Sequence, residues 1–516
     1  MRALGLSIVT AALTLGGALA HAAELRIGLS ADVTAIDPHA INITPNNTIG
    51  WHVFDALTHV DENTRLIPGL AESWRAIDAT TWEFKLRRGV KFHDGSELTA
   101  DDVLFSLERP LKVQNGQYNT FVQRLTSREA PDRYTVRVKT ATPYAMVPYD
   151  LNSIFIVSKK AATGATTEDF NAGRAMIGTG PFKFRRFARG DRIELERNDD
   201  YWGGKPEWEK LSFRIMPSDP SRLAALLAGD VDMIEAVPTA DLAKLRANAR
   251  FALTQKVSWR TIFFHLDQSR DSVPGLTDKG GKPLTKNPLK DVRVRQAISK
   301  SLNRQAIVER VMESAATPAS NLVAPPVFGH VAALKIEPYD IEGAKKLLAE
   351  AGYPQGFDLL LAAPNNRYVN DDQVAQAVAQ MLTRIGIGTK VETRPISAYI
   401  PKAREGGYAF AMLGWGSFSG DLALRSLVAT PDDKKGFGTW NWSKYSNPKV
   451  DALIEQGFAL TDDKKREALA QEAMTIAMRD YAVIPVHHQI ATWAMRAGLK
   501  YSGRTDEYTF GHQVKP

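Results

Sequence analysis

Cysteine is absent from this chain of 516 residues. Its absence excludes a disulfide scaffold, a cysteine nucleophile, a thiolate-ligated metal site and a lipid anchor on an N-terminal cysteine. A strong charge of one sign is also missing, because 65 Lys and Arg balance 58 Asp and Glu, and the basic pairs are scattered among acidic residues. Nucleic-acid binding is therefore not expected. A chain that is 44% hydrophobic and 24% charged is typical of a globular protein, here with about two to four domains.

Common catalytic motifs are missing as well. The chain has no Gly-x-Ser-x-Gly elbow, no phosphate-binding Walker loop, no Gly-x-Gly-x-x-Gly fingerprint and no His-Glu-x-x-His zinc motif. His487 and His488 lie in a segment that reads as extended, so their side chains point to opposite faces and do not predict a shared metal. We expect no catalytic residues, no cofactor and no metal, and favour a binding protein over an enzyme.

The first 22 residues have the pattern of a secretory signal peptide. Arg2 supplies a positive start, residues 3–19 are uncharged and rich in Ala, Leu and Gly, and Ala20-His21-Ala22 fits the small-x-small cleavage rule. The alternative is a single membrane-spanning anchor, which needs about 20 strongly apolar residues. The serine, threonines and glycines of this stretch favour the signal peptide. The sequence thus predicts export to a periplasm, with residues 1–22 removed.

Strand and helix patterns alternate along the whole chain. Alternating apolar residues predict strands near 25–29, 81–86, 134–138, 211–215, 261–266, 408–413 and 482–490. Helical spacing appears after the expected N-cap Thr99, over 344–351 before Gly352, and over 374–385 before Gly386. The fold class is therefore α/β with mixed sheets. Residues 268–287 are polar and rich in Gly and Pro, and we interpret them as a linker before a helix starting near Asp291.

Several short blocks resemble one protein family. They are LAESW at 70–74, GVKFHDG at 89–95, LTADDV at 98–103, IGTGPF at 177–182, NDDYW at 198–202, ALLAGDVD at 225–232, VRVRQAI at 292–298, AKKLLAEAG at 344–352 and YSNPKVD at 445–451. Together, and in this order, they resemble the family 5 extracellular solute-binding proteins, the peptide and nickel class that serves ATP-binding-cassette (ABC) importers. The resemblance covers nearly the whole chain after the signal segment.

The resemblance implies a two-lobed periplasmic-binding-protein fold of type II, cluster C-like, with a hinge and an extra domain. Lobe one would consist of residues 23–57, 182–267 and 486–516. The extra domain would be residues 58–181, within lobe one. Lobe two would span 268–485, so the chain would cross between lobes near 268 and return near 485. The hinge would close the lobes around a ligand, and a membrane permease would recognise the closed form.

The resemblance also suggests ligand-binding residues. In peptide binders of this family a Gly-Trp pair after a strand precedes an acidic residue that holds the ligand ammonium. Gly414-Trp415 matches the pair, and Asp421 is the displaced acidic residue, although the usual Asp-Pro pair is missing. Core packing is the alternative role for Trp415, and a helix cap is the alternative for Asp421.

A carboxylate partner and three further contacts complete the predicted site. Arg367 lies between a strand and a helix, where dipeptide binders carry an arginine, and a solvent-facing loop arginine is its alternative. Tyr368, Trp440 and Asn42 are predicted contacts because they are aromatic or amide residues on loops expected to border the cleft.

The sequence therefore favours a monomeric periplasmic binding protein for di- or oligopeptides, with an ABC permease as its partner. Within the same fold, the ligand could instead be a nickel chelate, an opine, glutathione, haem or an oligosaccharide. A secreted hydrolase and a structural or chaperone-like protein are the alternatives of other classes. The hydrolase lacks a recognisable nucleophile, base and orienting residue.

Overall fold

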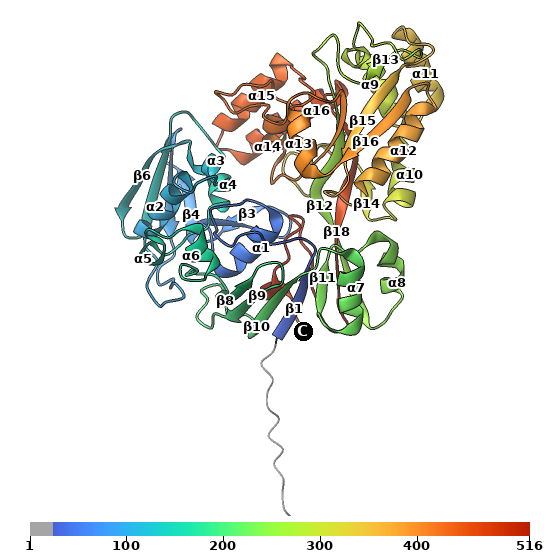
Figure 1. The fold of residues 1–516 in the computed structure, drawn as a ribbon. Coiled ribbons are helices and arrows are strands. Elements are labelled where there is room, and N and C mark those ends of the chain that lie inside the picture. Colours follow the sequence, from blue (N-terminus) through green and yellow to red (C-terminus); the bar gives the residue numbers. More distant parts are fainter. Residues whose placement is uncertain (1–23) are drawn as a thin grey trace, which may run out of the picture.

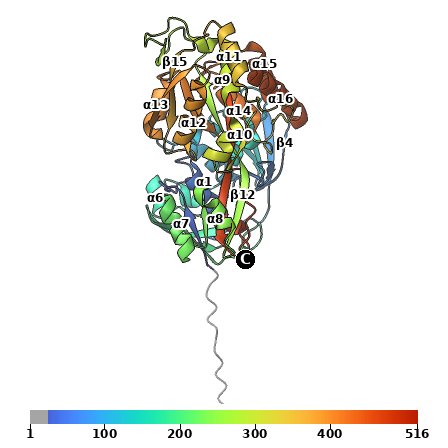
Figure 2. The same cartoon turned by 90° about the vertical axis from the view of Figure 1, so that its right-hand side faces the viewer.

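The structure, a computed structural model, describes residues 24–516. The predicted signal peptide, residues 1–22, lies outside the described residues. Two lobes are visible in Figure 1, one above the other, with a further group of strands and helices beside the lower lobe. The long strands β12 (Phe251–Leu266) and β18 (Ile484–Arg496) run from one lobe into the other. Figure 2 shows this connection from the side.

The lower lobe and the group beside it are formed by the first half of the chain and its C-terminal end. The lower lobe contains β1 (Glu24–Leu29), α1 (Thr44–Val53), β8 (Phe182–Ala188), β9 (Arg192–Arg197), β10 (Lys210–Ile215), α7 (Asp219–Ala228), β11 (Met233–Glu235) and α8 (Leu242–Arg246). The neighbouring group contains β2 (Thr58–Val60), β3 (Leu66–Pro68), β4 (Ala71–Ala76), β5 (Thr81–Leu86), α2 (Ala100–Glu108), α3 (Asn119–Val122), β6 (Leu125–Asp132), β7 (Thr135–Thr140), α4 (Val147–Asn152), α5 (Lys159–Ala162) and α6 (Thr167–Asn171). We propose that this group is the extra domain, residues 58–181.

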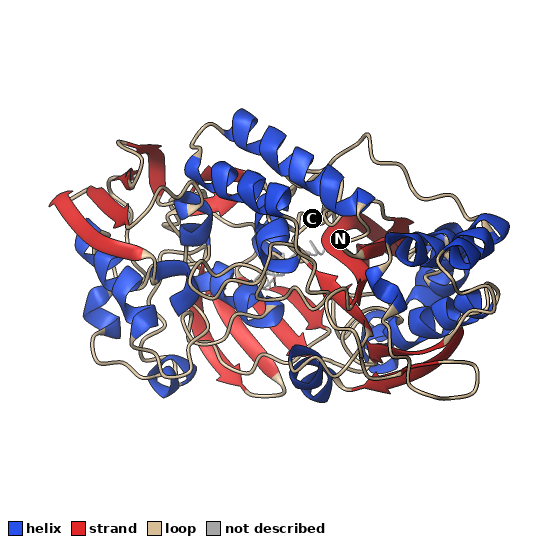
Figure 3. Ribbon diagram, turned by 90° about the horizontal axis from the view of Figure 1, so that it is seen from above, coloured by secondary structure: helices blue, strands red, loops and turns tan. Residues whose placement is uncertain are grey.

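The upper lobe is formed between the two long strands. It contains β13 (Leu276–Thr277), α9 (Val292–Ser301), α10 (Arg304–Ala306), β14 (Ala316–Pro318), α11 (Ile341–Glu350), β15 (Asp358–Pro364), α12 (Asp371–Thr383), β16 (Gly388–Arg394), α13 (Ile396–Arg404), β17 (Phe410–Trp415), α14 (Gly420–Leu427), α15 (Pro448–Ala459) and α16 (Asp463–Arg479). Seen from above, strands and helices are mixed along the whole molecule (Figure 3). The predicted α/β class with mixed sheets is confirmed.

Local sequence signals explain several element ends. Thr99 caps α2 in a reciprocal capping box, in which its backbone N–H donates to Asp102 at 3.0 Å. Gly352 and Gly386 follow α11 and α12 with φ of 92° and 90°, a left-handed conformation that glycine adopts without steric cost. Asp291 caps α9 by accepting a bond from the Arg293 backbone N–H. The predicted strands and helices at these positions are confirmed.

One mixed sheet runs through both lobes. Its order is β13-β15-β17-β12-β18-β11-β1-β10-β9-β8, with β16 on β15 and β14 on β18. β15 pairs in parallel with β16 and β17, whereas β17 and β18 are antiparallel to β12. The extra domain has its own antiparallel sheet, β4-β5-β7-β6. Because the two lobes share the continuous strands β12 and β18, only these two segments need to bend if the lobes move.

The crossing lies inside the strands rather than after them. The register between β12 and β18 shifts between Val257 and Thr261, and residues 258–260 have no β18 partner. The predicted linker, residues 268–287, instead belongs to the upper lobe, where β13 pairs with β15. Its Gly and Pro residues form turns between elements of one lobe. We therefore propose lobe boundaries near 258–260 and 488–490 in place of 268 and 485.

Three large apolar clusters form the cores. One lies in the lower lobe around β1, β10 and α1, and another lies in the upper lobe around β15, β17 and α12. The third joins the extra domain to helices α14, α15 and α16 of the upper lobe. Across residues 24–516, the structure holds no helix with the length and apolar character required to cross a bilayer.

Candidate functional site

Trp415 ends strand β17 and is flanked by two glycines. A Cβ atom on Gly414 would lie 2.6 Å from the ring of Tyr368, and one on Gly416 would lie 2.5 Å from the indole Nε1 of Trp259. The Tyr368 hydroxyl also donates to the Gly414 carbonyl at 3.1 Å. Glycine is needed on both sides because aromatic rings pack directly on the backbone. These rings fix the position of Trp415, which is half-buried.

The other predicted aromatic residue, Trp440, lies against Trp415. Their ring centroids are 5.4 Å apart, and Trp440 is 5.9 Å from Trp442. The guanidinium of Arg404 stacks on Trp440 at 4.3 Å, a cation–π geometry. Trp415 and Trp440 are both half-buried, so each keeps part of its ring accessible. Together they form an aromatic surface that an apolar or planar ligand group could cover.

Trp259 lies where β12 crosses between the lobes. The backbone N–H of Trp259 donates to the Thr505 carbonyl at 2.8 Å. At this position β12 therefore pairs with the C-terminal segment instead of with β18. The Trp259 ring contacts Phe418 at 5.0 Å and Tyr508 at 6.2 Å. The indole Nε1 is buried and has no hydrogen-bond partner among the described residues. An unpaired buried donor is uncommon in proteins, and a ligand oxygen is one acceptor that could bond it.

Charged groups accompany this crossing. Arg260 forms an ion pair with Glu507 at 2.6 Å, and the Ser258 hydroxyl donates to the same carboxylate at 2.6 Å. Burial alone would raise the pKa of Glu507, but the guanidinium of Arg260 brings that pKa below its ordinary value. Glu507 has φ of 67°, an uncommon conformation for a residue with a side chain. Such strained residues cluster at functional sites.

Arg367 adds a second positive charge beside this pair. Its guanidinium lies 5.4 Å from the ring centre of Tyr368. The residue is exposed, yet desolvation by the surrounding protein and the like charge of Arg260 lower the pKa of its guanidinium. Among the described residues, Arg367 and Arg404 form no ion pair. Two carboxylates, Glu507 and Asp371, lie near Arg367 without forming an ion pair with it, so its guanidinium keeps donors that an anionic group could use.

Asn42 reaches the same region through a polar chain in the lower lobe. The Asn47 side-chain amide donates to Asn42 Oδ1 at 2.7 Å and to the Tyr508 hydroxyl at 3.2 Å. Tyr118 donates to the Asn47 carbonyl oxygen. Because Tyr508 contacts Trp259, these amides connect Asn42 to the crossing.

Asp421 is placed differently from the other predicted residues. Its side chain is buried, and its carboxylate accepts a bond from Arg466 at 2.7 Å. The Ser419 hydroxyl and the Leu422 backbone N–H also donate to it. A carboxylate with these partners is already compensated. The structure thus brings together Arg367, Tyr368, Trp415 and Trp440, and links Asn42 to them, while the Asp421 carboxylate has partners of its own.

The sequence patterns did not indicate four residues of this site: Trp259, Arg260, Glu507 and Tyr508. Trp259 and Arg260 directly precede the predicted strand 261–266. An aromatic residue next to a basic residue at the start of a strand was the one sequence feature that could have indicated them. Glu507 and Tyr508 lie in a C-terminal segment without periodicity, 247 residues from Arg260. Only the tertiary pairing of the C-terminal segment with β12 identifies them.

Within residues 24–516, no group of three or more His, Asp or Glu side chains is arranged to hold a metal ion. His487 and His488 both lie buried in β18. His488 Nδ1 lies 2.8 Å from the Thr261 hydroxyl, which is an ordinary structural contact.

Replacing Gly416 with alanine tests the packing around Trp415. The added Cβ would displace the Trp259 indole, so we expect a loss of about 1–3 kcal/mol of folding free energy and weaker ligand binding. Gly457→Ala in α15 is the control, because its Cβ would meet only Arg466 Cγ at 4.0 Å and should stabilise the helix by about 0.5–1 kcal/mol. Urea unfolding of both variants measures the difference. Equal effects would contradict the packing described here.

Comparison with known proteins identifies the family. Residues 65–427 match the family described as "Bacterial extracellular solute-binding proteins, family 5 Middle". The chain belongs to this family. A dipeptide-binding protein from Escherichia coli is 31% identical, covering 85% of this chain and 83% of that protein. A heme-binding protein A from Haemophilus influenzae is 29% identical, covering 87% and 83%.

Solved structures agree with this family membership. HbpA2 from Haemophilus parasuis superposes with a TM-score of 0.82 at 26% identity, covering 95% of this chain and 99% of that chain. A periplasmic binding protein DppA from Helicobacter pylori, in complex with the peptide STSA, has the same fold, with a TM-score of 0.76 at 24% identity, covering 95% and 97%. The predicted two-lobed fold is confirmed. The protein is a solute-binding component of an ABC importer and not an enzyme.

Proposed function

We propose that this family 5 solute-binding protein captures di- or oligopeptides between its lobes in the periplasm and delivers them to the permease of an ABC importer. The observation that carries the proposal is the position of Arg367 and its neighbour Tyr368. They lie beside the Arg260–Glu507 ion pair, and Tyr368 also bonds the strand end that carries Trp415. Trp415 and Arg367 belong to the upper lobe, and Glu507 belongs to the C-terminal segment in the lower lobe. A dipeptide-binding relative at 31% identity supports the same ligand class.

Each part of a peptide has a counterpart in this group. The peptide carboxylate would bind Arg367, because a guanidinium offers charge-assisted bonds to carboxylates. Its ammonium would approach Glu507, whose side chain is 20% exposed, in place of Asp421. Apolar side chains would cover the Trp415–Trp440 surface, and waters would adapt the remaining space to different peptides.

Glutathione-like ligands are a second candidate. The relatives include a glutathione-binding protein from Pectobacterium atrosepticum, 27% identical over 87% of this chain and 85% of that protein. The guanidinium of Arg404, stacked on Trp440 and without an ion pair among the described residues, offers a place for a second carboxylate. A planar haem could also cover the Trp415–Trp440 surface, and the relatives include a heme-binding protein A. A nickel chelate, an opine and an oligosaccharide have no comparable support from a particular residue.

A thermal-shift screen tests the ligand class. Purified protein would be heated with peptides, glutathione, opines, sugars, haem and nickel chelates. A ligand at 100 times its Kd stabilises the folded state by about 2.7 kcal/mol, so a peptide should raise the unfolding midpoint clearly. The peptide proposal fails if peptides leave the midpoint unchanged while another class raises it. Turnover of a stabilising ligand would contradict the transport role.

Replacing Arg367 with alanine tests its role directly. We expect affinity for peptides with a free C-terminal carboxylate to fall about 10- to 100-fold, the loss of a charge-assisted bond. Affinity for the same peptides as C-terminal amides should change little. Arg384→Ala, which removes an exposed arginine from the end of α12, is the control. Calorimetric titration measures all three proteins, and equal losses for acids and amides would remove Arg367 from the site.

A further inference from the structure

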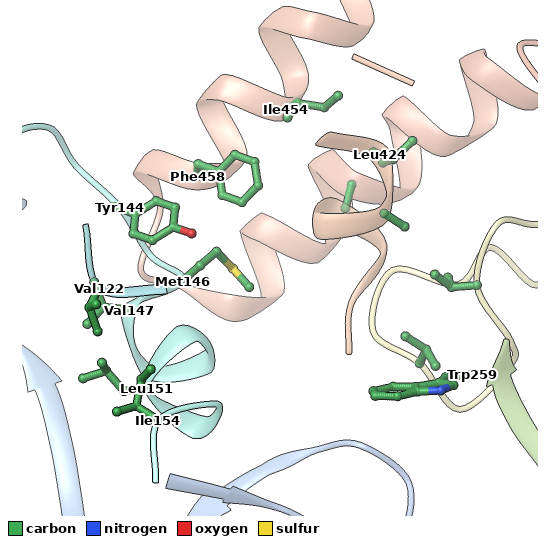
Figure 4. Close-up of a cluster of buried hydrophobic side chains, with 14 of the residues drawn as sticks. Val122, Tyr144, Met146, Val147, Leu151, Ile154, Trp259, Leu424, Ile454 and Phe458 are labelled. Atoms are coloured by element: carbon green, nitrogen blue, oxygen red, sulfur yellow. The ribbon is translucent and has the colours of Figure 1, made fainter. Parts of the chain in front are cut away.

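The extra domain and the upper lobe meet at a second interface, apart from the strand crossing. Figure 4 shows Tyr144 and Met146 of the extra domain facing Phe458 and the helices of the upper lobe. The Ala145 backbone N–H donates to the Phe458 carbonyl at 2.7 Å, and the Tyr144 and Phe458 rings are 5.9 Å apart. In Figure 1, α14, α15 and α16 lie above α3 and α4, while β12 and β18 connect the lobes elsewhere.

A polar chain spans this interface beside the apolar contact. Arg425 of α14 donates to the Tyr144 hydroxyl at 3.1 Å, and that hydroxyl donates to Asp150 at 2.8 Å. Arg124 of the extra domain donates to the Lys435 carbonyl of the upper lobe at 3.0 Å. Tyr144 and Asp150 are both buried, whereas the Arg124–Lys435 contact is exposed. The bonds from Arg425 and Arg124 cross the interface and therefore depend on the two lobes being together.

The buried pair Asp421–Arg466 belongs to the same interface. Arg466 Nη1 lies 2.6 Å from the sulfur of Met146, and its guanidinium lies 5.3 Å from the ring centre of Tyr149. Both contacted residues are in the extra domain, whereas Arg466 is in α16 of the upper lobe. Asp421 thus orients a cation that faces the extra domain. This contact gives Asp421 a role that does not require it to touch a ligand.

We propose that this interface is a closure latch, in which Tyr144 and Arg425 are positioning residues that set ligand affinity without contacting the ligand. The latch rests on the proposed capture of a ligand between the lobes. Contacts made only in the closed form shift the population toward that form. Trp415 and Arg425 lie ten residues apart on one continuous segment, β17 to α14. The segment that carries the aromatic surface therefore also carries one half of the latch.

Tyr144→Phe tests the latch with a minimal change. The variant keeps the ring but loses the hydroxyl that joins Arg425 to Asp150. Tyr134→Phe is the matched control, because the Tyr134 hydroxyl also donates to a carboxylate, Glu97 at 2.7 Å, but within the extra domain alone. Arg425→Met removes the other partner of the Tyr144 hydroxyl and serves as a second variant. Because the protein has no cysteine, Lys139→Cys and Lys464→Cys provide specific spin-label sites on the two sides of the latch.

The probe is the peptide with the largest effect in the thermal screen. Tyr144→Phe and Arg425→Met should each bind it about 5- to 30-fold more weakly, with faster dissociation and a larger population at the long label separation. Tyr134→Phe should match the wild-type protein. Equal affinity, dissociation rate and label distances in Tyr144→Phe and Tyr134→Phe would overturn the latch.

A failure of the proposed function would give a different pattern. If no compound of the screen binds the wild-type protein, the capture proposal fails. The distances between the spin labels in the ligand-free proteins then test whether the latch exists. A short-separation population that is present in the wild-type protein and reduced in Tyr144→Phe supports it. Identical distributions in the two proteins overturn it.

Discussion

Replacing Arg466 with methionine is expected to lower the free energy of unfolding by about 3–5 kcal/mol, the cost of removing one partner of a buried ion pair. The Arg466 and Asp421 side chains are only 1% and 3% exposed and lie 2.7 Å apart. Methionine would fill much of the space but leave the Asp421 carboxylate buried without its cation. Urea unfolding monitored by tryptophan fluorescence measures the loss.

A double-mutant cycle separates the pair from its surroundings. Asp421→Asn combined with Arg466→Met should recover part of the stability lost in Arg466→Met, because no unpaired charge remains buried. Lys435→Met, which breaks the exposed pair with Glu455, is the control and should cost less than about 1 kcal/mol. The opposite pattern would return Asp421 to the ligand site. In that case Asp421→Asn would leave the stability unchanged, and it would weaken the binding of peptides with a free ammonium more than the binding of their N-acetyl forms.

Acid is expected to unfold the protein at a mildly low pH. Seven histidines have lowered pKa values because burial disfavours their charged form: the pKa falls to about 4 for His39, His52 and His93, to about 3 for His265, His487 and His488, and below its ordinary value for His512. Each imidazole stays neutral in the folded state near pH 5, whereas in the unfolded state it is protonated below about pH 6.5. Their contribution to stability is therefore complete above pH 6.5 and is lost as the pH falls toward 4 and 3.

The expected loss is large compared with the stability of a typical protein. At pH 5 each histidine costs about 2 kcal/mol, and total stabilities are about 5–15 kcal/mol. Asp150 acts in the opposite direction, because burial raises its pKa to about 6. Its contribution is present below its ordinary pKa near 4 and is lost as the pH rises through 6. One such carboxyl group offsets only part of the loss from seven imidazoles.

Urea midpoints at pH 7.5, 6 and 5 measure this effect. The midpoint should fall steeply across the series, and His52→Phe should reduce the slope because one buried imidazole no longer titrates. His330→Phe is the control, since that histidine is only partly buried. A midpoint that stays constant from pH 7.5 to 5 would contradict the assignment of these imidazoles as buried and neutral.

Local patterns predicted the secondary structure well because the governing interactions are local. The alternation at 81–86 became β5, the Thr99 cap became the start of α2, and Gly386 ended α12. The same reasoning predicts a crossing near residue 268, whereas we propose a crossing inside β12. Glycine and proline in 268–287 mark turns, and turns occur inside a lobe as well as between lobes. The register of β12 against β18 breaks between Val257 and Thr261, and we propose the crossing there.

The site was predictable only where its residues lie on one segment or follow a family motif. Trp415 and Trp440 came together as aromatic neighbours. The partner of Asp421 did not follow from the sequence, because Arg466 is 45 residues away and many arginines were available. The position of Asp421 at a predicted helix start left a choice between capping and ligand binding. The ion pair with Arg466 is a third role, which the structure shows. Contacts between distant segments depend on the tertiary fold rather than on a local pattern.

A crystal structure of the protein with its tightest peptide tests the central proposal most directly. We predict electron density for the peptide between the lobes, with its carboxylate on Arg367, its ammonium near Glu507 and a side chain on the Trp415–Trp440 surface. The Asp421 carboxylate should remain bound to Arg466. A peptide located elsewhere, or one whose ammonium displaces Arg466 from Asp421, would contradict the proposal.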